Sequence, residues 1–277
     1  MTDRFLFMGG DKRISYAMRE ISELFPADKL GAGGVYLEPV GRYSRIVLPF
    51  PFSRNGTDIN APLSEAPLPL SAITEYAAEN AVVFSGGTNA ALEQLCRENE
   101  LTLVNYADDE ALTLKNAALT AEAAAAILIN NTDGSLLGAD VLVTGGGRVA
   151  ECTARLLNAF GSNVTVCARN SAQLARAELL GCKAEKLSRI DSLLPRCDIV
   201  INTVPASLFT AEKFKEMKKD AVFEELASLP QEPYKSCAEN CGVKYIYAAG
   251  LPGKFSPKTA GSLIADFILE YQTCSAQ

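Results

Sequence analysis

The stretch Ala139-Asp-Val-Leu-Val-Thr-Gly-Gly-Gly-Arg-Val-Ala150 decides the fold of this chain. Its first six residues form a short apolar run typical of a strand, a glycine turn follows, and a helical pattern continues through Phe160. A strand, a glycine turn and a helix in this order open a dinucleotide-binding domain. The stretch therefore predicts an α/β fold with a nucleotide site at residue 145.

Within this stretch, Gly145, Gly147 and Ala150 are spaced as G-x-G-x-x-A. The first glycine permits a tight turn, the second lets the backbone approach a pyrophosphate, and the small third residue lets the helix pack on the strand. Arg148 and Val149 lie where free N–H groups at a helix N-terminus favour anions. These residues are candidate cofactor contacts, and the alternative is a purely structural βα turn.

Further βα units follow. Strands are expected at 163–167, 183–186, 198–202, 221–225 and 243–247, with helices at 171–180, 188–194, 211–217 and 234–240. The first half is less regular, with strands expected at 5–8, 45–48, 81–84 and 101–105 and helices at 12–25, 72–79 and 89–98. Repeated βα units predict parallel, doubly wound sheets in two Rossmann-like domains.

The boundary between the domains is expected near the alanine-rich helix 116–128 and the turn Asn130-Asn-Thr-Asp-Gly134. Residues 1–130 are expected to form an N-terminal substrate domain, 131–255 a nucleotide-binding Rossmann domain, and 256–277 a C-terminal helix that packs back on the first domain. Crossing helices would join the domains and leave a cleft between them. Residues 49–70 carry five prolines and predict an exposed loop.

Composition restricts the class of protein. With 48% hydrophobic and 21% charged residues the chain is globular. A net charge of -7 argues against nucleic acid or an anionic membrane as partners. The apolar run at 5–8 is too short for a signal peptide, and Thr120 and Glu122 interrupt the apolar stretch 117–129, so a cytoplasmic protein is expected. A homo-oligomer is left open.

The cysteine and histidine contents restrict the chemistry. Eight scattered cysteines are expected to be reduced thiols, and Cys237 with Cys241 lacks the further ligands of a zinc site, so no metal is expected. The chain has no histidine. This excludes Ser-His-Asp and Cys-His catalysis and the histidine relay of hydroxyacid dehydrogenases, so protons must move through Lys, Asp, Glu, Tyr, Cys or water.

The end of the second Rossmann strand indicates the choice of cofactor. An NAD site usually places an acid there, but this chain has Arg169, Asn170 and Ser171, and no acid before Glu178. A guanidinium can bind a 2′-phosphate that a carboxylate would repel. NADP is therefore favoured over NAD, and the alternative is a solvated Arg169.

Two other segments predict anion binding. In Phe84-Ser-Gly-Gly-Thr-Asn89, Thr88 is a plausible helix N-cap and nearby N–H groups could receive a carboxylate. In Gly9-Gly-Asp-Lys-Arg13, a cap by Asp11 explains the turn as well as a bound anion does. The segment 250–261, rich in glycine and proline, could line the cleft or form a rigid linker that ends in an N-capped helix.

Several motifs together resemble the family of dipicolinate synthase A subunits over nearly the whole chain. They are Gly9-Gly-Asp-x-Arg13, Val83-Phe-Ser-Gly86 with Asn89, Asp108-Asp-Glu-Ala111 with Asn116 and Thr120-x-Glu122, Gly145-x-Gly-Arg148, Ala168-Arg-Asn-Ser171, Ile201-Asn-Thr-Val-Pro205, and Gly250-Leu-Pro-Gly253 with Pro257-Lys-Thr-Ala-Gly261. Two departures concern substrate choice: Ala150 replaces a glycine, and 225–230 lacks an expected arginine and paired glycines.

The resemblance implies an NADP-dependent enzyme that oxidises dihydrodipicolinate, or its hydroxylated tetrahydro precursor after water loss, to pyridine-2,6-dicarboxylate for bacterial spores. It implies action with a flavoprotein-like B subunit, in the mother cell of a sporulating bacterium. Two alternatives remain. One is a non-catalytic partner subunit that binds NADP, and the other is a shikimate-dehydrogenase-like or hydroxyacid oxidoreductase.

The candidate residues for this reaction fall into three groups. The dicarboxylate substrate is expected to contact Ser85, Thr88, Asn89, Lys254 and Thr259. Candidate catalytic residues are Lys258, Lys115 and Glu122. The nicotinamide is expected beside Thr203, Val204 and Pro205.

Overall fold

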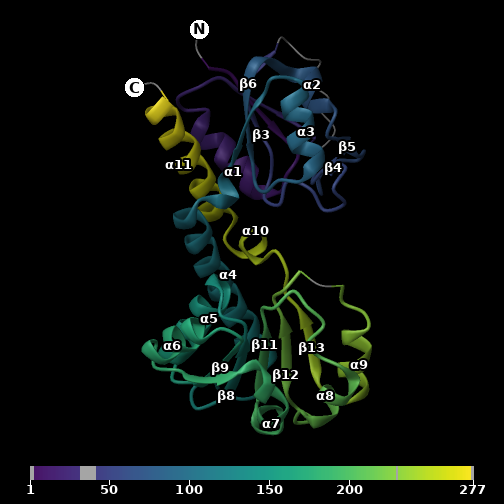
Figure 1. Ribbon diagram of the computed structural model, residues 1–277, viewed down its shortest axis with the longest axis vertical. Helices are drawn as coiled ribbons and strands as arrows, with labels where there is room; N and C mark the ends of the chain where they lie inside the picture. The colour runs from purple at the N-terminus through teal and green to yellow at the C-terminus, as the bar shows by residue number, and fades with distance from the viewer. Residues whose placement is uncertain (1–2, 32–41, 229, 276–277) are drawn as a thin grey trace. The chain divides into compact units, whose positions relative to one another are not determined.

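The computed structural model describes residues 3–31, 42–228 and 230–275 (Figure 1). The chain divides into two compact units. The first unit is Met1–Asn116 with Ser256–Gln277, and the second is Ala117–Phe255. Each unit contains a parallel β-sheet with helices, so the predicted α/β fold with parallel sheets is confirmed.

The sheet of the second unit has six parallel strands. They are β8 (Asp140–Thr144), β9 (Asn163–Ala168), β10 (Lys183–Lys186), β11 (Ile199–Asn202), β12 (Val222–Glu225) and β13 (Lys244–Tyr247). Their spatial order is β10-β9-β8-β11-β12-β13. Counted from β8 this is the 3-2-1-4-5-6 order of dinucleotide-binding sheets, in which the strand order reverses between the first and fourth strands. The turns after β8 and β11 therefore flank the place where such sheets bind ligands.

Helices cover both faces of this sheet (Figure 1). One face packs against α5 (Arg148–Ala159), α6 (Ser171–Leu179) and the C-terminal part of α4 (Glu110–Asn131). The other packs against α7 (Ile190–Leu193), α8 (Ala211–Glu216) and α9 (Tyr234–Asn240). Two 3₁₀ turns, η2 (Leu187–Arg189) and η3 (Leu194–Arg196), flank α7. The inner strands β8, β9, β11 and β12 are thus largely buried between the two layers of helices, whereas the edge strands β10 and β13 are partly exposed.

The first unit has a sheet of five parallel strands. They are β1 (Phe5–Met8), β2 (Ala27–Leu30), β3 (Tyr43–Val47), β6 (Ala77–Ser85) and β7 (Thr102–Asn105), in the order β2-β1-β3-β6-β7. This is the flavodoxin-like 2-1-3-4-5 order, whose switch point lies between the first and third strands. Strand β2 was not predicted, because the edge sequence Ala-Asp-Lys-Leu has no apolar run.

Two helices distant in sequence share one face of this sheet. Helix α1 (Lys12–Ile21) packs against α11 (Pro257–Ser275) over a core that includes Phe5, Phe84 and Ile264. A Cβ on Gly261 of α11 would lie 2.5 Å from the Arg13 backbone oxygen, so a larger residue there would separate the helices. The other face packs against α2 (Ala72–Tyr76) and α3 (Ala90–Glu98), and the 3₁₀ turn η1 (Tyr106–Asp108) follows β7.

One sequence prediction is wrong, and one segment is more regular than expected. The region 49–70 is not simply an exposed loop, because β4 (Asp58–Ile59) and β5 (Leu68–Pro69) pair antiparallel within it, and Ile59 and Leu68 belong to the core. The segment 250–261 is largely helical. It forms α10 (Leu251–Phe255) and the first turn of α11, because proline is tolerated at the start of a helix.

Helix α4 is longer than the predicted 116–128. Within the described ranges it is the one helix that is long and apolar enough to span a membrane, with a mean hydropathy of 1.4 in its most apolar window. Half of that window is buried inside the protein, which is also the behaviour of a core helix, so the signal is weak. Among the same residues, no group of three or more Cys, Asp or Glu side chains is placed to hold a metal ion.

One polar side chain in the core carries a stability prediction. Glu224 on β12 is fully buried, and neither carboxyl oxygen has a hydrogen-bond partner among the residues described. Burial raises the pKa of Glu224 well above its usual value of 4.5. The folded protein therefore keeps a proton that the unfolded chain releases, and stability must fall as pH rises above the unfolded-state pKa.

We expect Glu224→Gln to reduce this pH dependence, which amounts to at most about 1.4 kcal/mol per pH unit for one such group. The measurement is urea unfolding of both proteins at pH 5.5, 7.0 and 8.5. Glu178→Gln on the exposed face of α6 is the control and should follow the wild type. Equal pH dependence in wild type and Glu224→Gln would contradict the prediction.

Candidate functional site

The turn after β8 lies against the segment after β11. Gly145 has φ +105°, a conformation that side chains rarely adopt, and its N–H donates to the Cys167 carbonyl at 2.8 Å. A Cβ on Gly145 would lie 2.4 Å from the Thr203 Oγ1. The missing side chain therefore lets two segments predicted to contact the cofactor lie side by side.

The next part of the turn is open. Gly147 is the N-cap of α5, has an extended backbone, and offers no side-chain cap. A Cβ placed on Gly147 would meet nothing within 4 Å. By contrast, side chains of Asp11, Asn89 and Asn170 cap α1, α3 and α6. The first turn of α5, which begins with Arg148 and Val149, thus fits an anion such as a pyrophosphate.

The residues predicted to bind the 2′-phosphate follow the end of β9, at a place called here the cationic corner. Arg169, Asn170 and Ser171 are all exposed, but the Asn170 Oδ1 accepts a hydrogen bond from the Ala172 N–H at 2.8 Å as the cap of α6. Lys186 ends β10 and is the register partner of Ala168. Sequence reasoning did not select Lys186, because only the pairing of β9 with β10 brings it to this corner.

A polar network closes the carboxyl ends of β8, β11 and β12. The Thr144 Oγ1 donates to the Asn202 Oδ1 at 2.7 Å, and the Val204 N–H donates to the same oxygen at 3.1 Å. The Thr203 Oγ1 donates to the Thr144 carbonyl at 2.7 Å. The Asn202 Nδ2 donates to both carboxyl oxygens of Glu225, at 2.9 and 3.0 Å. The predicted segment Thr203–Pro205 is thus anchored on the neighbouring strands.

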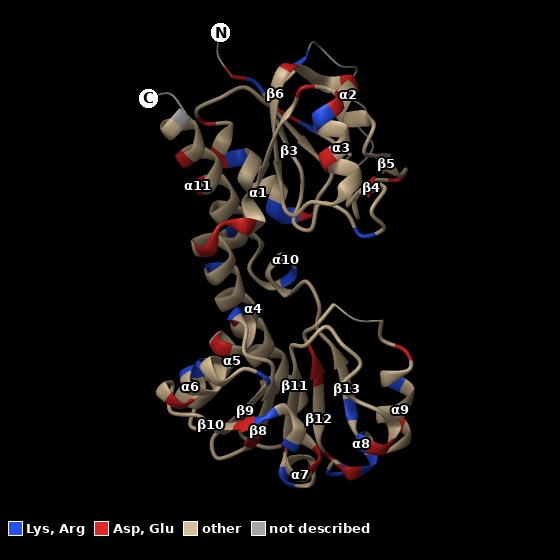
Figure 2. Ribbon diagram, in the orientation of Figure 1, with Lys and Arg blue, Asp and Glu red and all other residues tan. Residues whose placement is uncertain are grey.

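Asn202 and Glu225 were not among the residues predicted for the site. Each is a polar residue at the end of a buried strand, which is the signal that could have found them. Burial raises the pKa of Glu225 to about 7, although hydrogen bonds from Asn202 and the Ala227 N–H act in the opposite direction. Figure 2 shows this acidic end of β12. A carboxyl group that titrates near neutral pH therefore lies in the network.

In the first unit, two predicted substrate residues have internal partners. The buried Ser85 Oγ donates to the Gly87 carbonyl at 2.6 Å. Asn89 caps α3 by accepting from the Leu92 N–H, and its Nδ2 donates to the Gly56 carbonyl. The prediction that Thr88 is the N-cap is therefore wrong, since Asn89 has that position; Thr88 is exposed.

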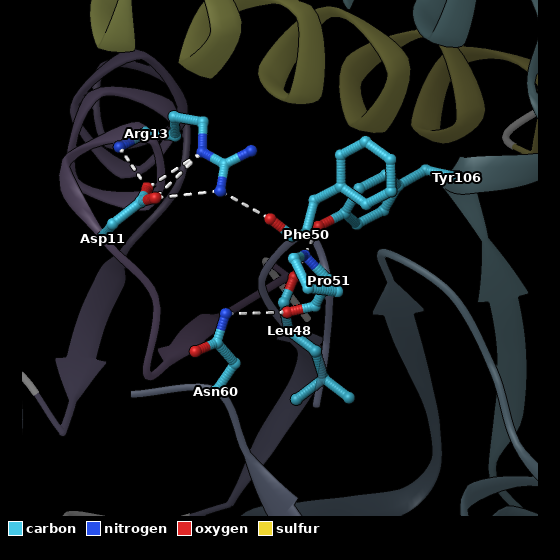
Figure 3. A network of polar contacts seen from close by, with 7 residues as sticks. All are labelled: Asp11, Arg13, Leu48, Phe50, Pro51, Asn60 and Tyr106. Atoms are coloured by element: carbon cyan, nitrogen blue, oxygen red, sulfur yellow. Dashed lines mark hydrogen bonds and ion pairs between the residues drawn. The ribbon is translucent and has the colours of Figure 1, made fainter. Parts of the chain in front are cut away.

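The turn after β1 is held by an ion pair (Figure 3). Asp11 accepts from the Arg13 backbone N–H at 3.0 Å and from the Arg13 guanidinium at 2.8 Å, and the guanidinium also donates to the Phe50 carbonyl. Burial opposes ionisation of Asp11, but its bonds and charge interaction with Arg13 prevail and lower the pKa of the carboxyl. The structure thus shows Asp11 as the cap of α1.

The remaining candidates are exposed side chains on three helices. Lys115 and Glu122 are on α4, Lys254 is on α10, and Lys258 and Thr259 are on α11. Lys115, Lys258 and Thr259 belong to the first unit, and Glu122 and Lys254 to the second. Their functional roles stay predictions.

One relative in sequence and two crystal structures resemble this chain over much or all of its length. The A subunit of dipicolinate synthase from Bacillus subtilis (strain 168) is 34% identical over 187 residues, which cover 68% of this chain and 63% of that protein. The crystal structure of the A subunit of dipicolinate synthase from Bacillus halodurans has a TM-score of 0.84 at 29% identity, over 97% of each chain. The dipicolinate synthase A chain from Bacillus subtilis has a TM-score of 0.83 at 26% identity, over 100% of this chain and 98% of that one.

Two domain families match separate parts of the chain. Residues 129–227 match the NAD binding domain of D-isomer specific 2-hydroxyacid dehydrogenases. This match and the open glycine turn at the switch point define the class, an NAD(P)-dependent oxidoreductase. Residues 37–107 match the N-terminal domain of the dipicolinate synthase A subunit. Together with the sequence relative and the two crystal structures, this confirms the resemblance to dipicolinate synthase A subunits that was read from the sequence.

The two glycines of the turn give opposite predictions. Gly147→Ala should leave the free energy of unfolding within about 0.5 kcal/mol of wild type, because the added methyl meets no atom of the protein. The methyl would occupy space that a pyrophosphate needs, so nucleotide affinity should fall about tenfold, or roughly 1.4 kcal/mol.

Gly145→Ala should instead lower the free energy of unfolding by about 1–3 kcal/mol, the cost of a strained backbone conformation. Calorimetric titration with NADP and urea unfolding of both variants are the measurements. An unfolding loss in Gly147→Ala as large as in Gly145→Ala would contradict the assignment of the open space to a ligand.

Proposed function

We propose that the chain is the A subunit of a dipicolinate synthase and oxidises dihydrodipicolinate to dipicolinate with NADP. The observation that carries the proposal is the union, in one chain, of the N-terminal domain of a dipicolinate synthase A subunit with an NAD-binding domain. The relatives named dipicolinate synthase support the substrate, since two of their structures align with nearly all of this chain.

In this reaction one hydride and one proton leave dihydrodipicolinate, and the ring becomes the aromatic pyridine-2,6-dicarboxylate. Bound NADP would supply the hydride acceptor. The protein must orient the ring, exclude water and accept the proton. Since the chain has no histidine, a Lys, Asp, Glu, Tyr or Cys side chain or water has to accept that proton.

NADP is proposed over NAD because of the charges at the end of β9. Exposed Arg169 follows the strand, Lys186 ends the neighbouring strand, and the next acid along the chain is Glu178 in α6. An arginine can bind a 2′-phosphate through two hydrogen bonds. No acidic residue, whose carboxylate would repel the phosphate, directly follows β9 in the sequence.

For the dicarboxylate substrate, the proposed contacts are exposed cationic and hydroxyl side chains. These are Thr88, Lys115, Lys254, Lys258 and Thr259, with Glu122 as a candidate proton acceptor. Ser85 and Asn89 are the less direct candidates, because their polar atoms already bond within the first unit. They would shape the turn that follows β6 more than bind the substrate.

The proposed partner is a B subunit, since the relatives are named as the A subunit of an enzyme. A cytoplasmic location in a sporulating cell belongs to the same proposal. A second function, that of an NADP-binding partner without turnover of its own, is favoured by one observation. Residues 225–230 lack the arginine and paired glycines expected near the nicotinamide.

Cofactor preference can be measured by calorimetric titration of the purified chain with NADP and with NAD. NADP should bind more tightly. Arg169→Ala should weaken NADP binding about tenfold or more, the effect of removing a charged hydrogen-bond donor, and should leave NAD binding unchanged. Arg196→Ala, at the end of η3, is the matched control. An equal loss for both nucleotides in Arg169→Ala would count against a 2′-phosphate contact.

Catalysis can be measured from NADPH formation with dihydrodipicolinate, for the chain alone and with a B subunit. Turnover by the chain alone would exclude the function of a partner without turnover. If the chain binds the nucleotide but shows no turnover, both alone and with a B subunit, the proposed enzyme activity is excluded. Lys258→Ala should lower turnover severalfold with no change in NADP affinity, because the lysine is assigned to the substrate.

A further inference from the structure

We propose that Glu225 is a positioning residue that acts through Asn202 on the Thr203–Val204 segment and makes nucleotide affinity depend on pH near neutrality. This inference rests on the proposed binding of nucleotide at the turns after β8 and β11. It concerns two residues that the sequence prediction did not assign to the site.

The geometry gives Asn202 two chemically distinct ends. Its Oδ1 accepts from the Val204 N–H at 3.1 Å and from the Thr144 Oγ1 at 2.7 Å. Its Nδ2 donates to Glu225 and, at 3.2 Å, to the Val204 carbonyl. An ionised carboxylate only accepts hydrogen bonds, so it fixes the Nδ2 on its own side and leaves the Oδ1 for the Val204 N–H.

When Glu225 is protonated, it no longer fixes which end of the Asn202 amide faces Val204. One carboxyl oxygen then carries a hydrogen and becomes a donor that competes with the Asn202 Nδ2. If the Asn202 amide turned to accept from it, the amide nitrogen would face the Val204 N–H, and two donors would oppose each other. Either arrangement gives up a hydrogen bond of the Asn202 amide, which holds the segment that borders Gly145.

The surroundings of Glu225 make it the group that titrates. Its carboxyl is fully buried, and the Ala227 N–H donates to it at 3.0 Å. Two tyrosines of β13 are its neighbours: Tyr247 is its register partner, and Tyr245 interacts with its charge. Burial and Glu225 raise the pKa of Tyr245 far above its usual value, so Tyr245 stays neutral. Tyr247, Tyr234 and Glu232 reach Tyr245 in turn. With a pKa of about 7, Glu225 changes charge between pH 6 and pH 8.

The matched control is the adjacent residue of the same strand. Glu224 is equally buried, but successive strand residues point to opposite faces, and its carboxyl makes none of the hydrogen bonds of the network. A general effect of an acidic group in β12 would appear in both Glu224→Gln and Glu225→Gln. An effect through Asn202 would appear in Glu225→Gln alone.

The experiment is calorimetric titration with NADP at pH 6.0, 7.0 and 8.5 for the wild type, Glu225→Gln, Glu224→Gln and Asn202→Ala, with melting temperatures taken under the same conditions. The 2′-phosphate of the probe also titrates in this range, but it contributes equally to all four proteins. The relevant quantity is therefore the difference in pH dependence from wild type.

Between pH 8.5 and pH 6.0, the NADP affinity of wild type and of Glu224→Gln should fall about fivefold more than the affinity of Glu225→Gln. A factor of about five corresponds to the loss of one hydrogen bond. Glu225→Gln should bind about fivefold more weakly than wild type at pH 8.5 and about equally well at pH 6.0, because glutamine resembles the protonated carboxyl. Asn202→Ala retains the carboxyl but not its connection to Val204, so it should lack the extra dependence too, and it decides the question if Glu225→Gln does not fold.

Parallel pH profiles of wild type and Glu225→Gln, or of wild type and Asn202→Ala, would overturn the inference while the proposed nucleotide site stood. An altered profile in Glu224→Gln equal to that in Glu225→Gln would overturn it as well. Absence of NADP binding by wild type at every pH would instead refute the proposed function, and the inference with it.

Discussion

The nucleotide site depends on the close approach of the Gly145 backbone to the Thr203 side chain. A Cβ at Gly145 would overlap the Thr203 Oγ1, so only a glycine lets the turn after β8 lie against the segment after β11. The sheet order makes those two segments neighbours, because β8 pairs directly with β11. Next to this contact lie the positive φ of Gly145, the open N-terminus of α5 and the hydrogen bond from Thr203 to Thr144.

Both units bury a parallel sheet between helices, but the covering helices come from different parts of the chain. In the second unit, most covering helices follow the strands they connect, as βα units dictate. In the first unit, one face needs α11, which the chain supplies only after the whole second unit. Gly261 matters here, since its missing side chain allows α11 to approach the α1 backbone. The first unit therefore cannot complete its core until the C-terminal helix is present.

Much of this architecture could be predicted from the sequence, because apolar strand runs and glycine turns are local signals. The strands of the second unit, the glycine turn and the corner at Arg169 follow from such signals. Polar or proline-bearing elements were missed, notably β2 and the β4–β5 pair, because pairing and burial stabilise them and local propensity does not. Lys186 and the Asn202–Glu225 pair were missed because strand register brings them together, and register is a long-range property.

The two acids that end β12 show how one strand separates two physical roles. Glu224 and Glu225 are both fully buried, and alternation along the strand sends their side chains to opposite faces of the sheet. On one face Glu224 meets an apolar core that offers no partner, so its neutral form is favoured. On the other face Asn202 and the Ala227 N–H donate to Glu225, which moderates the effect of burial and leaves its pKa near neutrality. The hydrogen-bond donors at the carboxyl ends of the strands thus help to decide which of the two carboxyl groups can change charge near neutral pH.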